Sequence, residues 1–297
     1  MLERKVIRAK VTGFCMGVRQ AVETACCEIE KNSRGNVYTL GPLIHNPHVL
    51  EELESRGLKI IDLQELPENF NGAAVIIRAH GVSLQTEADL QRRGVLVIDA
   101  TCPKVKSSQL KAAEFSKAGY FLFLAGDESH AEIAGIRGYY ETTETEVIIV
   151  NSPSMAEKSA KKLFAISPNA KTALIGQTTI SAEEYKAIGS VISHYFPDLV
   201  IVNTICNATK ERQDSLRELT GKVDGIIIAG GKDSANTRRL YDIAKASGKP
   251  CTLAEKAADI PKEFFSLKTI GLAAGTSTPD YVIKEIEERI RFYDTKS

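Results

Sequence analysis

The sequence has no surplus of charge of either sign. Its 38 lysine and arginine residues balance 38 aspartate and glutamate residues, so the formal net charge at neutral pH is zero. Proteins that bind nucleic acid or an anionic membrane through their bulk charge carry a basic excess instead. We therefore expect no nucleic-acid partner and no membrane partner, and any bound anion must be held by a local site.

Long hydrophobic runs are also missing. The longest apolar runs fall far short of the roughly 18 residues that a membrane span needs. The first ten residues, MLERKVIRAK, are charged and lack the apolar stretch of a secretory signal. We therefore expect a cytoplasmic protein. In such a protein the six cysteines are better explained as thiols, metal ligands or catalytic groups than as a disulfide framework.

Three common site motifs are absent as well. The chain has no C-x-x-C pair, no Walker A sequence and no G-x-G-x-x-G stretch. The last two motifs mark sites that cradle nucleotide phosphates, so a nucleotide is not the expected anion. Without a C-x-x-C pair, the spacing of the cysteines does not by itself identify a metal.

Three cysteines follow one local pattern. Cys15, Cys102 and Cys206 each come after a short apolar segment and before a segment with the apolar spacing of a helix. The segments before the last two are rich in valine and isoleucine, which favours buried strands. The same order of strand, cysteine and helix thus occurs three times.

Glycine turns recur at matching distances from these cysteines. The first turn after each cysteine, at Gly41, Gly126 and Gly230, lies 26, 24 and 24 residues further along the chain. A repeated order of elements indicates a repeated architecture, and strands that alternate with helices predict parallel sheets.

The repeat predicts the fold class and the domains. We expect an α/β protein with three small parallel-sheet lobes, formed by residues 1–98, 99–203 and 204–297. We expect the lobes to lie in a pseudo-threefold arrangement around a central cavity, because ligands of parallel sheets bind beyond the carboxyl ends of the strands. A single long doubly wound sheet is the alternative that the pattern leaves open.

The three repeated cysteines are candidate metal ligands. Each is expected at a strand-to-helix turn, where the helix N-terminus favours the thiolate. Three converging thiolates suit either zinc or an iron–sulfur cluster, and the pattern does not decide between them. The other cysteines, Cys26, Cys27 and Cys251, are expected to be packing residues.

Polar side chains follow several predicted strands and suit phosphate binding. These candidates are His45, His80, His130, Thr178, Ser234, Asn236 and Ser277. A lone serine at a strand end is usually only a helix cap, as we expect for Ser83 and Ser181. Several polar turns around one cavity instead favour an anion site.

Glu132 is a candidate proton donor. It follows His130 by two residues at the expected start of a helix. One interpretation is an ordinary acid in the first helical turn, stabilised by the helix dipole. The other is a general acid whose pKa is raised by burial and by neighbouring anions. The sequence pattern leaves both open.

A set of short motifs occurs in a fixed order along most of the chain. They read GFCMGV, AHGVS, DATCP, HAEIAG, GQTTIS, TICNAT, SANTRRL and AAGTSTP. In this order the chain resembles the 4-hydroxy-3-methylbut-2-enyl diphosphate reductases of the non-mevalonate isoprenoid route. The resemblance implies a [4Fe–4S] cluster, held by Cys15, Cys102 and Cys206, with one open iron site.

The resemblance also implies roles for the polar residues. The diphosphate would be held by His45, His80, Ser234, Asn236 and Ser277. His130 and Thr178 would lie near the substrate, and Glu132 would deliver protons. The implied reaction uses two electrons and two protons to remove the allylic hydroxyl as water, which yields isopentenyl and dimethylallyl diphosphates. A ferredoxin or flavodoxin would supply the electrons.

Two positions depart from the family pattern. Ala235 stands where a second serine is common, and Asn207 stands where an aromatic residue is common. Two alternative functions use the same residues. One is a zinc-dependent phosphate-ester hydrolase or hydratase, and the other is a redox-sensing binding protein whose cluster regulates partner contacts.

Overall fold

The chain forms two compact units that are discontinuous in sequence. The terminal unit comprises Met1–Arg19, Ile44–Leu53 and Asn207–Ser297. The central unit comprises Gln20–Leu43 and Glu54–Cys206. The computed structural model describes residues 4–31, 36–62, 73–141 and 144–293. No helix within these ranges is long and apolar enough to cross a membrane.

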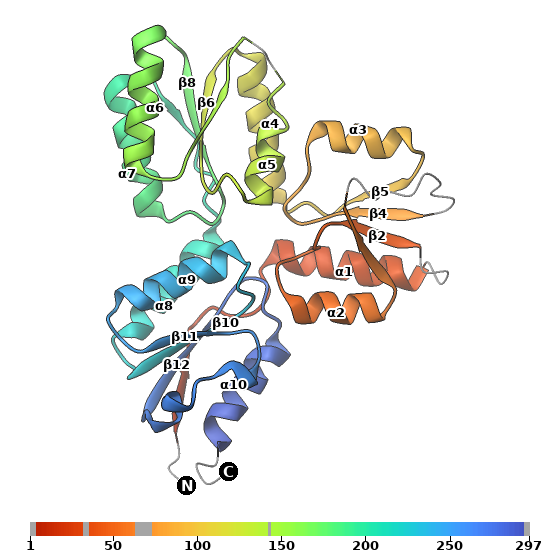
Figure 1. Ribbon diagram of the computed structural model, residues 1–297, viewed down its shortest axis with the longest axis vertical. Coiled ribbons are helices and arrows are strands. Elements are labelled where there is room, and N and C mark those ends of the chain that lie inside the picture. The colour runs from red at the N-terminus through yellow and green to blue at the C-terminus, as the bar shows by residue number, and fades with distance from the viewer. Residues whose placement is uncertain (1–3, 32–35, 63–72, 142–143, 294–297) are drawn as a thin grey trace. The chain divides into compact units, whose positions relative to one another are not determined.

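The terminal unit contains a four-stranded parallel sheet (Figure 1). Across the sheet lie β1 (Lys5–Arg8), β12 (Thr269–Ala274), β10 (Gly225–Ala229) and β11 (Cys251–Ala254). The first strand of the chain therefore pairs with the last, and Val6 lies in register with Ile270.

Helices cover both faces of this sheet. They are α8 (Asn207–Thr220), α9 (Ala235–Ala246) and α10 (Asp280–Phe292). On one face Ile226 of β10 packs in a cluster with Leu216 of α8, and on the other Ile227 packs with Ile283 of α10. Because both faces are buried, β10 is apolar throughout and does not alternate with polar residues.

The central unit contains two more four-stranded parallel sheets. Across the first lie β3 (Leu58–Ile61), β2 (Val37–Leu40), β4 (Ala74–Ile77) and β5 (Leu96–Asp99). Across the second lie β7 (Val147–Val150), β6 (Phe121–Ala125), β8 (Thr172–Gly176) and β9 (Val200–Ile201).

The second of these sheets also lies between two helical layers (Figure 1). Leu122 of β6 packs in a cluster with Ile133 of α5, whereas Phe123 packs in a cluster with Ile188 of α7. Within the described ranges, five helices of the central unit follow β4 in the chain. They are α3 (Leu84–Arg92), α4 (Pro103–Lys117), α5 (Ala131–Arg137), α6 (Pro153–Ile166) and α7 (Ala182–Tyr195). The described residues also form α1 (Met16–Lys31), α2 (Pro47–Ser55) and the short 3-10 helices Ala257–Asp259 and Lys262–Ser266.

All three sheets share one strand order, in which the fourth strand at the edge leads to a cysteine. β5 precedes Cys102, β9 precedes Cys206, and β1 precedes Cys15. In the terminal sheet the fourth place is taken by β1, from the opposite end of the chain. The predicted α/β fold with three parallel sheets is confirmed, and a single doubly wound sheet is wrong. The lobe boundaries at 98/99 and 203/204 and the arrangement around a central cavity stay predictions.

Candidate functional site

Each of the three cysteines is fixed by a hydrogen bond to a polar turn. In the terminal unit the Cys15 N–H donates to the Thr276 carbonyl at 3.1 Å. In the central unit the Cys102 N–H donates to Ala79 and the Cys206 N–H donates to Thr178, both at 3.0 Å. The parallel pairing of neighbouring strands is thus continued beyond their ends. As a result, the backbone of each cysteine lies beside one of the turns that the sequence singles out.

The cysteines lie at helix N-termini, as the sequence predicts. The carbonyl of Cys15 accepts from Arg19 N–H and that of Cys102 from Lys106 N–H, each at 2.9 Å, while α8 begins directly after Cys206. None of the three forms a disulfide bond, and each is of intermediate burial. Cysteine sulfur is a soft ligand that suits iron in a cluster or zinc.

The other cysteines have different surroundings. Cys27 is exposed, and the Cys26 sulfur accepts a hydrogen bond from Arg56 at 3.1 Å. Cys251 starts β11 and packs against a buried cluster of the terminal unit. That they are packing residues stays a prediction, and none of them adjoins a polar turn at a strand end.

Glu132 is buried in the central unit, with a relative exposure of 2 %. Its carboxylate accepts two hydrogen bonds from Thr178, from the backbone N–H at 2.6 Å and from Oγ1 at 2.9 Å. These bonds favour the carboxylate, but the loss of water around it outweighs them and raises its pKa to about 7. A carboxyl group with this pKa can both give and accept a proton near neutral pH.

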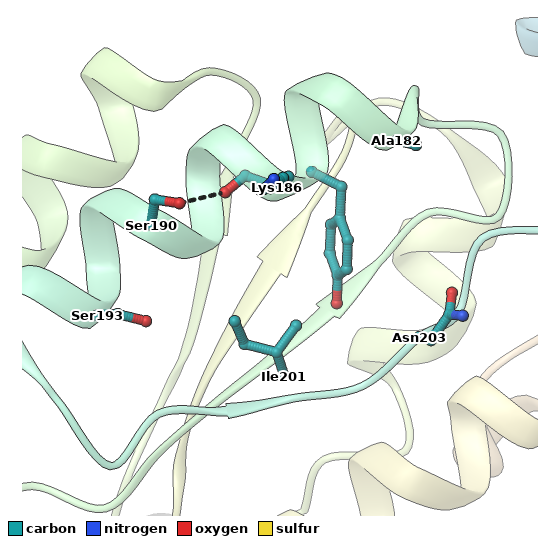
Figure 2. Close-up of a pocket in the computed structure, with 7 residues that line it drawn as sticks. Ala182, Lys186, Ser190, Ser193, Ile201 and Asn203 are labelled. Carbon is teal, nitrogen blue, oxygen red and sulfur yellow. Dashed lines mark hydrogen bonds between the residues drawn. The ribbon is translucent and has the colours of Figure 1, made fainter.

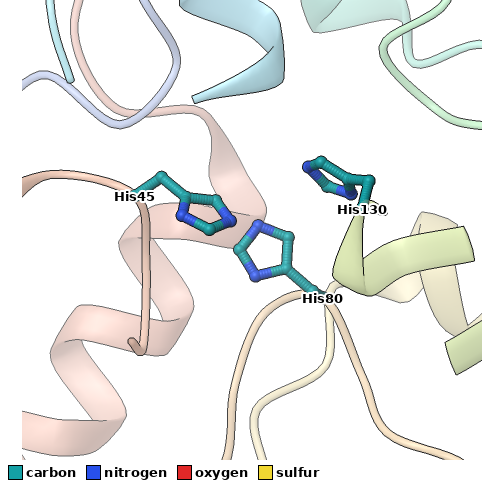
Figure 3. A group of neighbouring side chains, drawn as sticks. All are labelled: His45, His80 and His130. Atoms are coloured by element: carbon teal, nitrogen blue, oxygen red, sulfur yellow. The ribbon is translucent and has the colours of Figure 1, made fainter. Parts of the chain in front are cut away.

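His130 stands at the N-terminus of the helix that carries Glu132. Its Nδ1 accepts the Glu132 N–H at 3.1 Å and so caps α5. When the ring is neutral, this bond places its proton on Nε2, which is then a hydrogen-bond donor. The His80 ring lies edge-on to the His130 ring with centroids 5.4 Å apart (Figure 3). The central unit thus brings together His80, His130, Glu132 and Thr178.

In the terminal unit, two turns are tied to each other by side chains. The Ser277 hydroxyl donates to the His45 carbonyl at 3.1 Å, and the Asn46 amide donates to the Ser277 carbonyl at 2.8 Å. The turn that contains Gly231 also lies close to the His45 turn, because a Cβ atom added to Gly231 would lie 2.6 Å from the His45 carbonyl oxygen. Only glycine allows this approach of two backbones.

Asn236 lies in the first turn of α9 and is 2 % exposed. Within the described part of the chain, neither its Oδ1 nor its Nδ2 has a hydrogen-bond partner. A buried amide without partners is costly, which makes Asn236 a candidate for contact with a polar ligand. Ser234 caps α9 by accepting the Thr237 N–H at 3.3 Å, which leaves its own hydroxyl proton for an anion.

The buried polar residues of the terminal unit that the sequence reasoning missed include Asn46 and Arg212. Asn46 is 2 % exposed and links two of the candidate turns. Arg212 is 4 % exposed on α8, and it lies four residues before the fully buried Leu216. This helical spacing places Arg212 on the apolar face of α8, and it is the signal that could have identified the residue.

A pocket of about 500 Å³ opens between α7 and β9 of the central unit (Figure 2). It is lined by Ala182, Tyr185, Lys186, Ser190, Ser193, Ile201 and Asn203. The Ser190 hydroxyl donates to the Lys186 carbonyl of its own helix at 2.9 Å. None of the predicted site residues lines this pocket, so it is separate from the candidate site.

A model of the LytB protein family matches residues 6–291. The chain belongs to the LytB protein family. A LytB relative from Treponema denticola is 41% identical over 295 residues, which cover 96% of this chain and 98% of the relative. A relative from Aquifex aeolicus is 38% identical over 96% of both chains. Each is named 4-hydroxy-3-methylbut-2-enyl diphosphate reductase.

Solved structures show the same similarity. A diphosphate reductase from Plasmodium falciparum superimposes with a TM-score of 0.87 at 26% identity, covering 96% of this chain and 87% of that one. A structure described as (E)-4-hydroxy-3-methyl-but-2-enyl diphosphate reductase, the terminal enzyme of the non-mevalonate pathway, is 37% identical with a TM-score of 0.68. That match covers 97% of this chain and 99% of the solved one.

Proposed function

We propose that this protein reduces 4-hydroxy-3-methylbut-2-enyl diphosphate to isopentenyl and dimethylallyl diphosphates with a [4Fe–4S] cluster. The reductase activity is that of its full-length LytB relatives. In the proposal, Cys15, Cys102 and Cys206 hold the cluster and leave one iron site open. The zinc-dependent hydrolase or hydratase and the redox-sensing protein are both disfavoured by the relatives' shared name.

One observation carries the assignment of residues. Thr178 accepts the Cys206 N–H with its carbonyl and donates to Glu132 with both its N–H and its hydroxyl. A single residue therefore joins a candidate cluster ligand to a buried acid whose pKa is about 7. This is the arrangement that a reductive loss of water needs, since the departing oxygen must be protonated where the electrons arrive.

The three thiols fit the cluster by their chemistry. They lie at helix N-termini, are partly buried and form no disulfide with one another. When bound, a cluster with an open site supplies low-potential electrons and a Lewis-acidic iron for a poor leaving group. The same thiols would also bind zinc, so metal and sulfide analysis is needed to decide.

The remaining residues bind and orient the substrate in the proposal. In the terminal unit His45, Ser234, Asn236 and Ser277 hold the diphosphate, and the buried Asn236 amide gains the partners it lacks among the described residues. His80 of the central unit also contacts the diphosphate.

The reacting end of the substrate lies near central-unit groups in the proposal. His130 donates from Nε2 close to the substrate, because its Nδ1 already accepts the Glu132 N–H. Thr178 keeps the carboxyl group in place. Glu132 delivers the protons, one of which leaves with the hydroxyl as water while the other ends on the allylic carbon skeleton. Burial of Glu132 keeps a substantial protonated fraction at neutral pH.

We further propose a cytoplasmic setting with a small ferredoxin or flavodoxin as electron donor. The six cysteines form no disulfide bond with one another, which is typical of a reducing compartment.

The test is anaerobic purification and reconstitution, followed by iron, sulfide and zinc analysis and turnover with a reduced dye. We expect a brown protein with iron and sulfide in equal amounts. Cys15→Ser, Cys102→Ser and Cys206→Ser should each lose the cluster and the activity. Cys27→Ser is the matched control and should retain both, because its thiol is exposed. Full activity in colourless protein, or zinc without sulfide, would contradict the proposal.

A further inference from the structure

Arg212 of the terminal unit has a buried guanidinium group, and two of its nitrogens donate to backbone carbonyls. Nη1 donates to Ala208 at 2.9 Å within α8, and Nη2 donates to Gly13 at 2.7 Å. Arginine is almost never this fully buried unless its charge and donors are used. The Gly13 bond spans 199 residues of sequence, so it fixes a distant loop to this helix.

The loop that Arg212 holds leads to Cys15. Gly13 has a φ of +81°, and a Cβ atom there would lie 2.5 Å from Oδ1 of Asp280, so the loop can take this path only with glycine. The Cys15 N–H donates to Thr276 at 3.1 Å. The segment from Gly13 to Cys15 is therefore anchored at both ends, by Arg212 and by Thr276.

The helix that carries Arg212 begins at Asn207, directly after Cys206. Arg212 thus links the helix that follows one candidate cluster ligand to the loop that precedes another. Its planar guanidinium donates to two carbonyls at once through two separate nitrogens. A lysine has a single ammonium nitrogen and matches this geometry less well. A permanent cation in a dry interior also stabilises added negative charge nearby more than a solvated cation does.

We propose that Arg212 is a positioning residue that holds the Cys15 loop and raises the reduction potential of the cluster. This inference rests on the proposed cluster. Reduction adds one negative charge to the cluster, and the fixed cation beside the Cys15 loop stabilises that reduced state. The bond to Gly13 keeps Cys15 in place and so slows the loss of iron.

Three variants separate positioning, charge and general structure. Arg212→Met removes both the charge and the paired donors but keeps an aliphatic chain. Arg212→Lys keeps the charge and loses the planar fork. Arg217→Met is the matched control on the same helix, because Arg217 is exposed and pairs with Asp214 at 3.0 Å. A cation at that place is screened by solvent.

The experiment measures the midpoint potential of the reconstituted cluster and the rate at which a chelator removes its iron. We expect Arg212→Met to have a more negative potential and a several-fold faster loss of iron. Arg212→Lys should keep a potential close to that of the unaltered protein but also lose iron faster. Arg217→Met should match the unaltered protein in both measurements.

Two outcomes would overturn the inference while leaving the proposed function intact. The first is an Arg212→Met protein with the potential and iron retention of the unaltered protein. The second applies if Arg212→Met does not fold: iron retention in Arg212→Lys equal to that of the unaltered protein. By contrast, an unaltered protein that assembles no cluster would contradict the proposed function itself.

Discussion

Replacing Glu132 with glutamine should make the protein more stable at neutral and alkaline pH. The carboxyl group is buried, and desolvation raises its pKa from 4.5 to about 7 in the folded state. Glutamine has nearly the same shape and keeps an oxygen that accepts from Thr178. It carries no charge, however, so it has no cost of burying an ionised group.

The size of the effect follows from the two pKa values. Below about pH 4 the carboxyl is mostly protonated in both the folded and the unfolded protein, so the folded state carries no cost for a buried charge at this position. As the pH rises through 4.5 and then 7, the unfolded state loses its proton first, so the folded state becomes less favourable. The difference between the two pKa values corresponds to about 3 kcal/mol in the free energy of unfolding.

The assay is denaturant unfolding of the unaltered protein and of Glu132→Gln at pH 4 and pH 8, under anaerobic conditions. The stability of the variant relative to the unaltered protein should increase by about 3 kcal/mol between these pH values. Glu128→Gln, an exposed change in the turn before α5, is the control and should show no such increase. An equal difference at both pH values for Glu132→Gln would refute the raised pKa.

Three further substitutions test the site. Thr178→Val removes a hydrogen bond to the Glu132 carboxylate worth about 1.5 kcal/mol, so the alkaline limb of the pH–rate profile should shift to higher pH by about one unit. An unshifted limb would show that the Thr178 hydroxyl does not lower the pKa of Glu132. Asn236→Leu should weaken inhibition by inorganic pyrophosphate at least tenfold without lowering the free energy of unfolding; unchanged inhibition would remove Asn236 from the anion site. Gly231→Ala should cost about 1–3 kcal/mol of stability in denaturant unfolding, because its Cβ would press on the His45 carbonyl; unaltered stability would show that the two turns separate easily.

The elements around the cysteines could be predicted from the sequence because their signals are local. Strands rich in valine and isoleucine precede Cys102 and Cys206, and apolar residues at helical spacing follow them. Ser83 and Ser181 are N-caps, as expected, and accept from Thr86 and Glu184. Each of these features depends on a few neighbouring residues.

Long-range pairing could not be predicted in the same way. Nothing local to Lys5–Arg8 indicates that this strand pairs with Thr269–Ala274 and completes the sheet at the other end of the chain. The pattern also left two roles open for Glu132. The pKa of Glu132 depends on burial and on contacts with Thr178, a residue that lies 46 positions away in sequence. The hold of Arg212 on Gly13 depends on a still longer separation.

The most direct test of the account is Mössbauer spectroscopy of the anaerobically reconstituted protein, enriched in iron-57, with and without the allylic diphosphate substrate. A cluster held by Cys15, Cys102 and Cys206 has one iron without a protein ligand, so the substrate should change the signal of that single iron. A spectrum in which no iron responds to the substrate, or a protein without cluster iron, would contradict the account.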